Sequence, residues 1–152
     1  MAGYYQKLES ISSRLGMVEV LSEMLGKADK DEIKDLIYMT QGTLAPPFEG
    51  IEIGIAEKLA EEAIAIATGY SKEEVNADFR KTGDLGATAE KLIQTTKLKR
   101  MSKNKFKVKE VFEMLRKIAL TSGEGSKEAK INMLASLLAS SSPLEAKYIV
   151  RF

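Results

Sequence analysis

The segment TSGEGSKEAK, residues 121–130, combines residue types that can receive a phosphate group. A helix start leaves unpaired backbone N–H groups and the positive end of the helix dipole, and nearby glycines let the backbone approach an anion closely. Ser126 is a residue type that begins helices, and two glycines flank Glu124 just before it. The candidate phosphate contacts are Ser122, Gly123, Gly125, Ser126, Lys127 and, one turn further on, Lys130. The alternative is an ordinary helix cap, and the Glu124 carboxylate itself opposes close phosphate contact.

The segment KTGDLG, residues 81–86, permits the same argument. Thr82, Gly83 and Gly86 stand where a second helix should begin, with Thr82 or Asp84 as its cap. A phosphate contact through Thr82 and Gly83 and a purely structural cap are both compatible with these residues.

A basic segment between these two motifs suggests an anionic partner. Its cations, with no acidic residue among them, are Lys91, Lys97, Lys99, Arg100, Lys103, Lys105, Lys107 and Lys109. No amphipathic helix with bulky aromatics accompanies them, so we expect nucleic acid rather than a membrane. The candidate contacts are Lys97, Lys99, Arg100 and Lys103, and the alternative is a solvated basic loop.

The charge of the chain is polarised along its length. Residues 1–90 hold nine Lys and Arg against 17 Asp and Glu, whereas residues 91–152 hold 14 against five, so the balances are −8 and +9. Together they give the net charge of +1. The acidic half also suits a second hypothesis, a free-standing helical module that binds a protein partner.

The composition excludes several kinds of chemistry. The 152 residues include no cysteine and no histidine, which rules out disulfides, thiolate or imidazole zinc sites and a Ser-His-Asp triad. A carboxylate-metal enzyme using Glu57, Glu61 and Glu62 is a third hypothesis, but such a trio at helical spacing is more often a solvated face. With no signal segment and no apolar run of about 18 residues, we expect a cytoplasmic protein with one core and no membrane contact.

The elements that must position these residues are helices. Apolar residues at helical spacing predict two short helices before residue 26, with a break near Ser13 to Gly16. Asp29 to Glu32 has capping-box spacing and should begin a third helix that ends at Gly42, followed by a loop to Gly54. An alanine-rich helix should then end at Gly69, and Ser71 to Glu74 is a second capping box.

The second half continues the pattern. We expect a helix from residues 71 to about 81, another ending near Gln94, and one with a clean apolar stripe after Val108. The helix after Ser126 and a last one, with Ser142 as cap and Pro143 at its first position, complete the chain. The fold class is therefore all-α, an irregular bundle of about eight helices. Because no residue stops the last helix, we also expect a chain truncated at its C-terminus, and the alternative is a helix that frays at a natural C-terminus.

An ordered set of motifs resembles a known family. The segments are TQGTLAPPFEGIEIGIAEKLAEEAIAIATGYSKEEV, KTGDLG and RKIALTSGEGSKEAKINMLASLLASSSPLEAKYIVRF, and together they span nearly the whole chain. In this order and at these distances they are similar to the N-terminal DNA-binding domain of archaeal-type ATP-dependent DNA ligases. Residues 1–152 would then be that domain, incomplete at its end, without the nucleotidyltransferase and OB-fold domains.

The resemblance implies a helical domain that lies along the minor groove of nicked duplex DNA and closes a ring with the two missing domains. The parent reaction is ATP-dependent and Mg²⁺-assisted: a lysine takes AMP, passes it to the 5′-phosphate at the nick, and the 3′-hydroxyl displaces it. Such ligases serve DNA replication, repair and recombination. We expect a monomer whose phosphate contacts include Gly123 to Lys127.

The chain also departs from the family pattern. The adenylated lysine of these ligases stands in a Lys-x-Asp-Gly motif, whereas Lys81-Thr82-Gly83-Asp84 has the wrong order. This fragment should therefore bind DNA, bind no cofactor or metal and catalyse nothing, while ATP and Mg²⁺ belong to the full-length enzyme. Relatives continue into a segment with an arginine and glycine for the minor groove. The stretch LKRMS, residues 98–102, lacks the glutamine and aromatics of a sliding-clamp motif, which leaves clamp binding in doubt.

Overall fold

The computed structural model of the protein describes residues 1–98 and 106–152. These two ranges contain nine α-helices, one 3-10 helix and no β-strand, so the all-α prediction of about eight helices is confirmed. The elements are α1 (Ala2–Glu9), α2 (Arg14–Gly26), α3 (Ile33–Thr40), η1 (Pro47–Glu49), α4 (Glu57–Thr68), α5 (Lys72–Thr82), α6 (Leu85–Gln94), α7 (Val108–Leu120), α8 (Ser126–Ser140) and α9 (Pro143–Arg151). No helix in the described ranges has the length and apolar character needed to cross a membrane.

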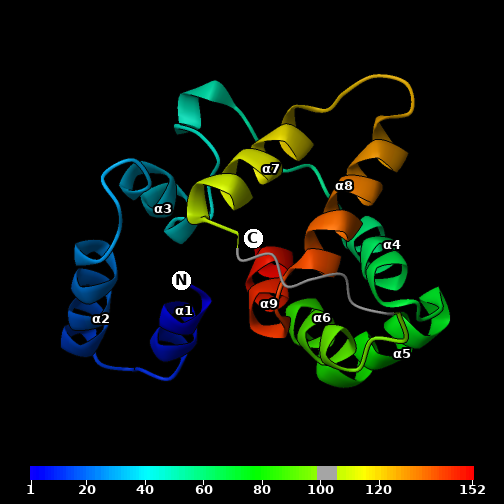
Figure 1. Cartoon of the computed structure of the whole chain (residues 1–152), viewed down its shortest axis with the longest axis horizontal. Helices are drawn as coiled ribbons and strands as arrows, with labels where there is room; N and C mark the ends of the chain where they lie inside the picture. The colour runs from blue at the N-terminus through cyan, green and yellow to red at the C-terminus, as the bar shows by residue number, and fades with distance from the viewer. Residues whose placement is uncertain (99–105) are drawn as a thin grey trace.

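The helices are arranged in two groups joined by α7 and α9 (Figure 1). On one side α4 packs against α8, α6 packs against α9, and α5 contacts α4 and α6. On the other side α1 contacts α2 and α9, and α3 contacts α7. The long loop from α3 to α4 contains η1 at the edge of the molecule (Figure 1).

One hydrophobic cluster holds the larger group together. It includes the fully buried Ile64 of α4, Leu115 of α7 and Leu137 of α8. Each fully buried aliphatic side chain of this kind stabilises the fold by roughly 1.5–3 kcal/mol. Met24 and Leu36 are also fully buried but lie outside that cluster, so α2 and α3 bury apolar surface of their own.

Local capping explains several helix boundaries. Ser71 and Glu74 form a complete capping box at α5, and Ser142 caps α9, so both predictions are confirmed. Glu145 completes a capping box at α9 as well. Gly69 ends α4 in the left-handed conformation with φ 74°, which glycine adopts without steric cost. At α6 the cap is Asp84, whose Oδ1 accepts a hydrogen bond from the Gly86 amide at 2.9 Å.

Two predicted caps are wrong. The box at Asp29 to Glu32 does not form, and α3 begins only at Ile33, because Asp29 starts a turn in which its carbonyl accepts from the Glu32 amide at 2.9 Å. Ser126 is the first residue of α8 and not its cap. Gly125 precedes it in a left-handed conformation with φ 76°, so the serine hydroxyl is past the capping position.

Candidate nucleic-acid interface

The loop between α7 and α8 leaves the first turn of α8 open to solvent. Gly123 and Gly125 have φ of 90° and 76°, and a Cβ at either position would have no heavy atom within 4 Å. The residue before the helix provides no side-chain cap. Within the described residues, the backbone amides of Lys127 and Glu128 have no backbone acceptor. The loop can therefore offer unpaired N–H donors to an anion.

The side chains around this helix start differ in exposure. Ser122, Gly123, Gly125 and Lys127 are exposed, whereas Ser126 and Lys130 are half-buried. Lys127 has no ion-pair partner in the part of the chain that the structure describes. Its ammonium group adds a positive charge to the positive end of the helix dipole.

Lys130 has a structural contact that its position in sequence does not reveal. Its Nζ donates a hydrogen bond to the Ile53 carbonyl at 3.3 Å, which joins α8 to the segment before α4. That segment leads to the start of α4, where Ala56 likewise provides no side-chain cap. Sequence patterns did not single out this second open helix start, and the Glu57 carboxylate in its first turn opposes an anion there.

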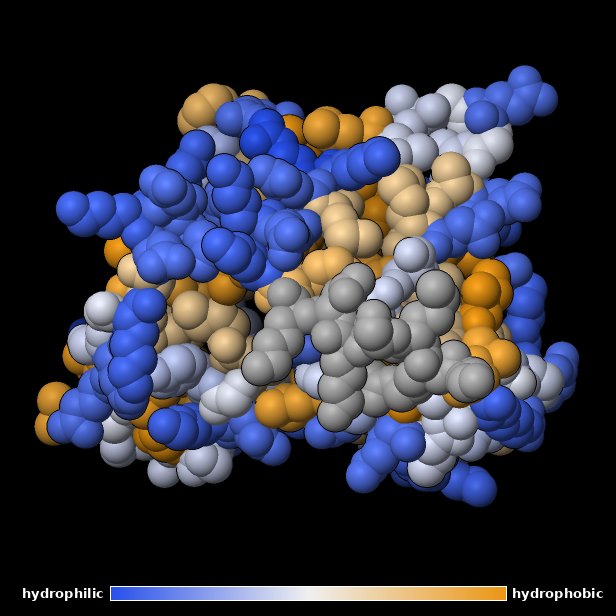
Figure 2. All heavy atoms as spheres, in the orientation of Figure 1, coloured by the Kyte–Doolittle hydropathy of each residue, from blue (hydrophilic) through white to orange (hydrophobic). Residues whose placement is uncertain are grey.

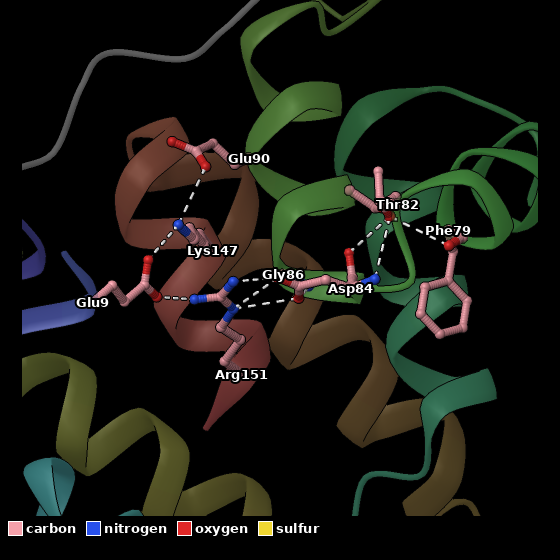
Figure 3. A network of polar contacts seen from close by, with 9 residues as sticks. Glu9, Phe79, Thr82, Asp84, Gly86, Glu90, Lys147 and Arg151 are labelled. Atoms are coloured by element: carbon pink, nitrogen blue, oxygen red, sulfur yellow. Dashed lines mark hydrogen bonds and ion pairs between the residues drawn. The ribbon is translucent and has the colours of Figure 1, made fainter. Parts of the chain in front are cut away.

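In the turn between α5 and α6, the Thr82 hydroxyl and the Asp84 carboxylate already form hydrogen bonds with other protein groups (Figure 3). The Thr82 hydroxyl bonds to the carbonyls of Phe79 and Asp84 at 3.2 and 3.1 Å, and Gly83 closes α5 with φ 67°. The Asp84 carboxylate caps α6 and accepts from the Arg151 guanidinium. In this geometry Thr82 and Gly83 act as structural caps, and a phosphate contact through them stays a prediction.

Arg151 belongs to an ionic network that joins α1, α6 and α9 (Figure 3). Its guanidinium pairs with both Glu9 and Asp84. The Lys147 ammonium lies 2.9 Å from a Glu9 carboxylate oxygen and 3.9 Å from Glu90. The hydrogen bond from Arg151 outweighs desolvation and holds the pKa of Asp84 below its ordinary value.

Lys97 is anchored, contrary to its expected place in a loose basic loop. Its ammonium lies 2.8 and 3.0 Å from the two Glu74 oxygens and 4.2 Å from the centre of the Tyr70 ring. Its backbone amide donates to the Thr68 carbonyl at 3.0 Å. The hydrogen bond from Lys97 lowers the pKa of Glu74. Lys97 therefore fixes the chain after α6 to the start of α5.

The remaining cations predicted for the basic segment, Lys99, Arg100 and Lys103, lie outside the described residues. So does most of the stretch from residue 98 to 102 that was considered for a sliding clamp. Within it only Leu98 is described, and its side chain covers Gly69. A role for these residues in binding stays a prediction.

Two of the three carboxylates considered for metal binding, Glu61 and Glu62, have other contacts. Glu61 is buried and accepts a hydrogen bond from the Asn76 amide at 3.0 Å, and Glu62 lies 2.7 Å from the Lys72 ammonium. Among the described residues no group of three or more possible metal ligands is brought together. Glu61 and Glu62 instead connect α4 to α5.

Comparison with known proteins gives matches over the whole chain. A family model described as DNA ligase N terminus matches residues 1–152. A DNA ligase of Sulfolobus acidocaldarius is 44% identical over 160 aligned positions, which cover 100% of this chain and 27% of the relative. A DNA ligase of Sulfurisphaera tokodaii is 46% identical with the same coverage, and one of Pyrobaculum islandicum is 44% identical over 95% of this chain. The chain thus spans about a quarter of the length of these curated relatives.

Proposed function

The chain belongs to the DNA ligase N-terminal family, and from that premise we propose that it binds duplex DNA as the N-terminal domain of an ATP-dependent DNA ligase. The match of the family model over residues 1–152 is the observation that supports this proposal most directly. In this proposal the chain is one part of an enzyme that seals nicks during replication, repair and recombination.

We assign the chemistry of sealing to the part of the enzyme beyond this chain. ATP and Mg²⁺ would act there, at a lysine in a Lys-x-Asp-Gly motif that residues 1–152 do not contain. The role left to this chain is to hold the duplex beside that active site. A domain that contacts only the DNA backbone increases the affinity for DNA and fixes its orientation without selecting a sequence.

The first turn of α8 is the proposed phosphate contact. Unpaired amides at Lys127 and Glu128, the helix dipole and the Lys127 ammonium all favour an anion there. The Glu124 and Glu128 carboxylates oppose it, so the contact should run through backbone amides. Gly123 and Gly125 supply the space, because no side chain stands between the backbone and the phosphate.

The basic segment has a different role in the proposal. Lys99, Arg100 and Lys103 supply attraction to DNA over a longer range, which salt screens. Lys97 is already paired with Glu74 and Tyr70, so in this proposal it holds the start of the segment in place and adds little free charge. Binding to a sliding clamp is not part of this proposal, and we expect the chain to act as a monomer.

A substitution at Gly125 tests the phosphate contact. Asparagine tolerates the left-handed conformation, so Gly125→Asn should fold while its side chain stands in the path of the phosphate. We expect the affinity for a nicked duplex, measured by fluorescence anisotropy, to fall about tenfold at every salt concentration, since charge-assisted hydrogen bonds contribute roughly 1.5–3 kcal/mol. No charge changes, so the salt dependence should stay the same.

Gly42→Asn is the matched control. Gly42 also has a left-handed backbone, with φ 69°, and open space around its Cβ position, but it lies at the end of α3. Both variants should show the same small loss of thermal stability, and only the Gly125 variant should bind DNA less well. Equal DNA affinity of the two folded variants would mean that the α7–α8 loop is only a cap.

A further inference from the structure

The helices α1 and α2 bury little of their own surface. Within these two fully described helices, no residue of α1 is buried and Met24 alone is buried in α2, whereas α4 has seven buried residues and α8 has five. Leu15 and Val18 on α2 are 78% and 51% exposed. Figure 2 shows hydrophobic atoms on the surface over this part of the molecule, at the left of the view. Packing therefore holds α1 and α2 in place less firmly than it holds α4 and α8.

The same two helices are joined to each other. The Tyr4 hydroxyl on α1 donates a hydrogen bond to a Glu23 carboxylate oxygen on α2 at 3.1 Å, and the Lys27 ammonium lies 5.7 Å from the centre of the Tyr4 ring. Among the described helices, α1 is the only one that α2 contacts extensively. The loop of residues 27–32 then leads from α2 to α3. Residues 2–26 therefore form one unit, which we call the α1–α2 strap.

Glu9 connects this strap to α9. Its carboxylate pairs with the Arg151 guanidinium and lies 2.9 Å from the Lys147 ammonium (Figure 3). The Lys147 side chain is only 13% exposed, so water and salt screen this pair less than they screen a pair on the surface. Of the three carboxylates that Figure 3 labels in this network, Glu9 belongs to the strap, whereas Asp84 and Glu90 belong to α6.

A cavity separates α1 from part of the fold beneath it. The cavity has a volume of about 320 Å³, and its walls include Tyr5 from α1, Met39 from α3, Val111 from α7 and Tyr148 from α9. At its edge the Tyr5 hydroxyl lies 3.1 Å from the Thr40 hydroxyl, and the centres of the Tyr5 and Tyr148 rings are 5.4 Å apart. Side chains that line a cavity have no packing partner across it. The strap is therefore attached to α3 and α9 by a few specific contacts around a cavity.

We propose that the α1–α2 strap opens and closes as one unit while the rest of the protein stays folded, and that Glu9 is the latch that holds it closed. Opening turns the strap about the loop of residues 27–32, separates Glu9 from Lys147 and Arg151, and exposes the apolar walls of the cavity on α3, α7 and α9. Because the latch is ionic, salt shifts the strap toward the open state. The inference concerns the chain without DNA, so it does not depend on the proposed function.

Hydrogen exchange of backbone amides, followed by NMR on the unbound 152-residue chain, tests the strap. Amides of α1 and α2 should exchange together and at least about a hundredfold faster than those of α4 and α8, because the strap opens without global unfolding. Glu9→Gln should speed exchange in both α1 and α2 about fivefold and leave α4 and α8 unchanged. A rise in salt from about 0.1 M to 1 M shortens the Debye length from about 10 Å to 3 Å, so it should speed exchange of the strap in the parent and have less effect in the Glu9 variant.

Glu90→Gln is the matched control. It removes a carboxylate that also faces Lys147, at 3.9 Å, but that belongs to α6, so exchange in α1 and α2 should not become faster. Fast exchange of α1 alone, with α2 as slow as α4, would mean that the first helix only frays at the chain end. Exchange of both helices at the rate of α4 would mean that they open only when the whole protein unfolds. Equal effects of Glu9→Gln and Glu90→Gln would show that Glu9 is not a latch. Each of these three results overturns the proposal.

Discussion

At the scale of single residues, Asp84 combines two structural roles. Its Oδ1 caps α6, and its carboxylate pairs with Arg151 on α9. Glu9 on α1 shares the same guanidinium and also accepts from Lys147. Desolvation would raise the pKa of Glu9, but the hydrogen bond from Lys147 and the nearby positive charges lower it. Both carboxylates therefore favour the folded state when they are ionised.

Asp84→Asn separates these two roles. Asparagine caps a helix about as effectively as aspartate does, but it has no charge and forms no ion pair with Arg151. A carboxylate whose pKa is depressed on folding stabilises the protein above its unfolded pKa, here 3.8 for Asp84, and loses that effect as the pH falls through the folded pKa. The variant should melt below the parent at pH 7, and the gap should narrow as the pH falls below about 4. Melting is followed by circular dichroism.

Glu124→Gln, in the exposed α7–α8 loop, is the control for removal of one negative charge. It should melt close to the parent at pH 7. A constant gap between Asp84→Asn and the parent down to pH 3 would show that the Arg151 pair does not stabilise the fold.

At the scale of elements, the α6–α9 contact depends on a glycine. A Cβ at Gly86 would lie 2.6 Å from Arg151 Cγ and 2.7 Å from the Lys147 carbonyl oxygen, which is closer than real Cβ atoms come. The carbonyl belongs to the backbone of α9, so it cannot turn aside. We expect Gly86→Ala to push α6 and α9 apart and to destabilise the protein by about 1–3 kcal/mol.

Chemical denaturation measures this effect against Gly3→Ala, since a Cβ at Gly3 in α1 meets nothing within 4 Å. Alanine there should leave stability unchanged or raise it by up to about 1 kcal/mol, because it favours the helix. Equal stability of both variants would contradict the close approach of α6 and α9.

The helices could be predicted because their signals are local. Serine with a glutamate three residues later set the starts of α5 and α9, and a terminal glycine set the end of α4. The same local signals failed at two helix starts where the backbone adopts a different conformation from the one that the cap residues favour. Asp29 formed a turn before α3, and Gly125 took the capping position before Ser126.

The contacts of the candidate site could be predicted only in part, because they join residues far apart in the chain. Lys97 binds Glu74, and Lys130 binds the Ile53 carbonyl across 77 positions. No periodicity or cap spacing encodes such pairs. The open helix start at α8 was expected from its glycines, which take left-handed backbone conformations just before the helix.

At the scale of the whole molecule, the folded chain cancels part of its own charge polarity. The C-terminal half contributes five cations to ion pairs with acids of the N-terminal half. These pairs are Lys91 with Asp78, Lys97 with Glu74, Arg116 with Glu49, Lys147 with Glu9, and Arg151 with Asp84. The positive excess of residues 91–152 is therefore only partly available to an anionic partner. Among the described residues, Lys107, Lys109, Lys117 and Lys127 form no such ion pair and are left to attract DNA.

The salt dependence of DNA binding tests how that remaining charge is used. For duplex DNA, every phosphate that the protein no longer neutralises should reduce the slope of log K against log salt concentration by about 0.9. Replacing Lys99, Arg100 and Lys103 by glutamate should weaken binding at low salt and flatten this slope. In high salt the effect should vanish, because a long-range attraction is screened. The control variant replaces Lys7, Lys30 and Lys34 by glutamate. It changes the net charge by the same amount, but these three residues lie in the acidic half of the chain. If both triple variants lower the affinity and the slope equally, net charge alone attracts DNA, and the basic segment has no special place in the interface.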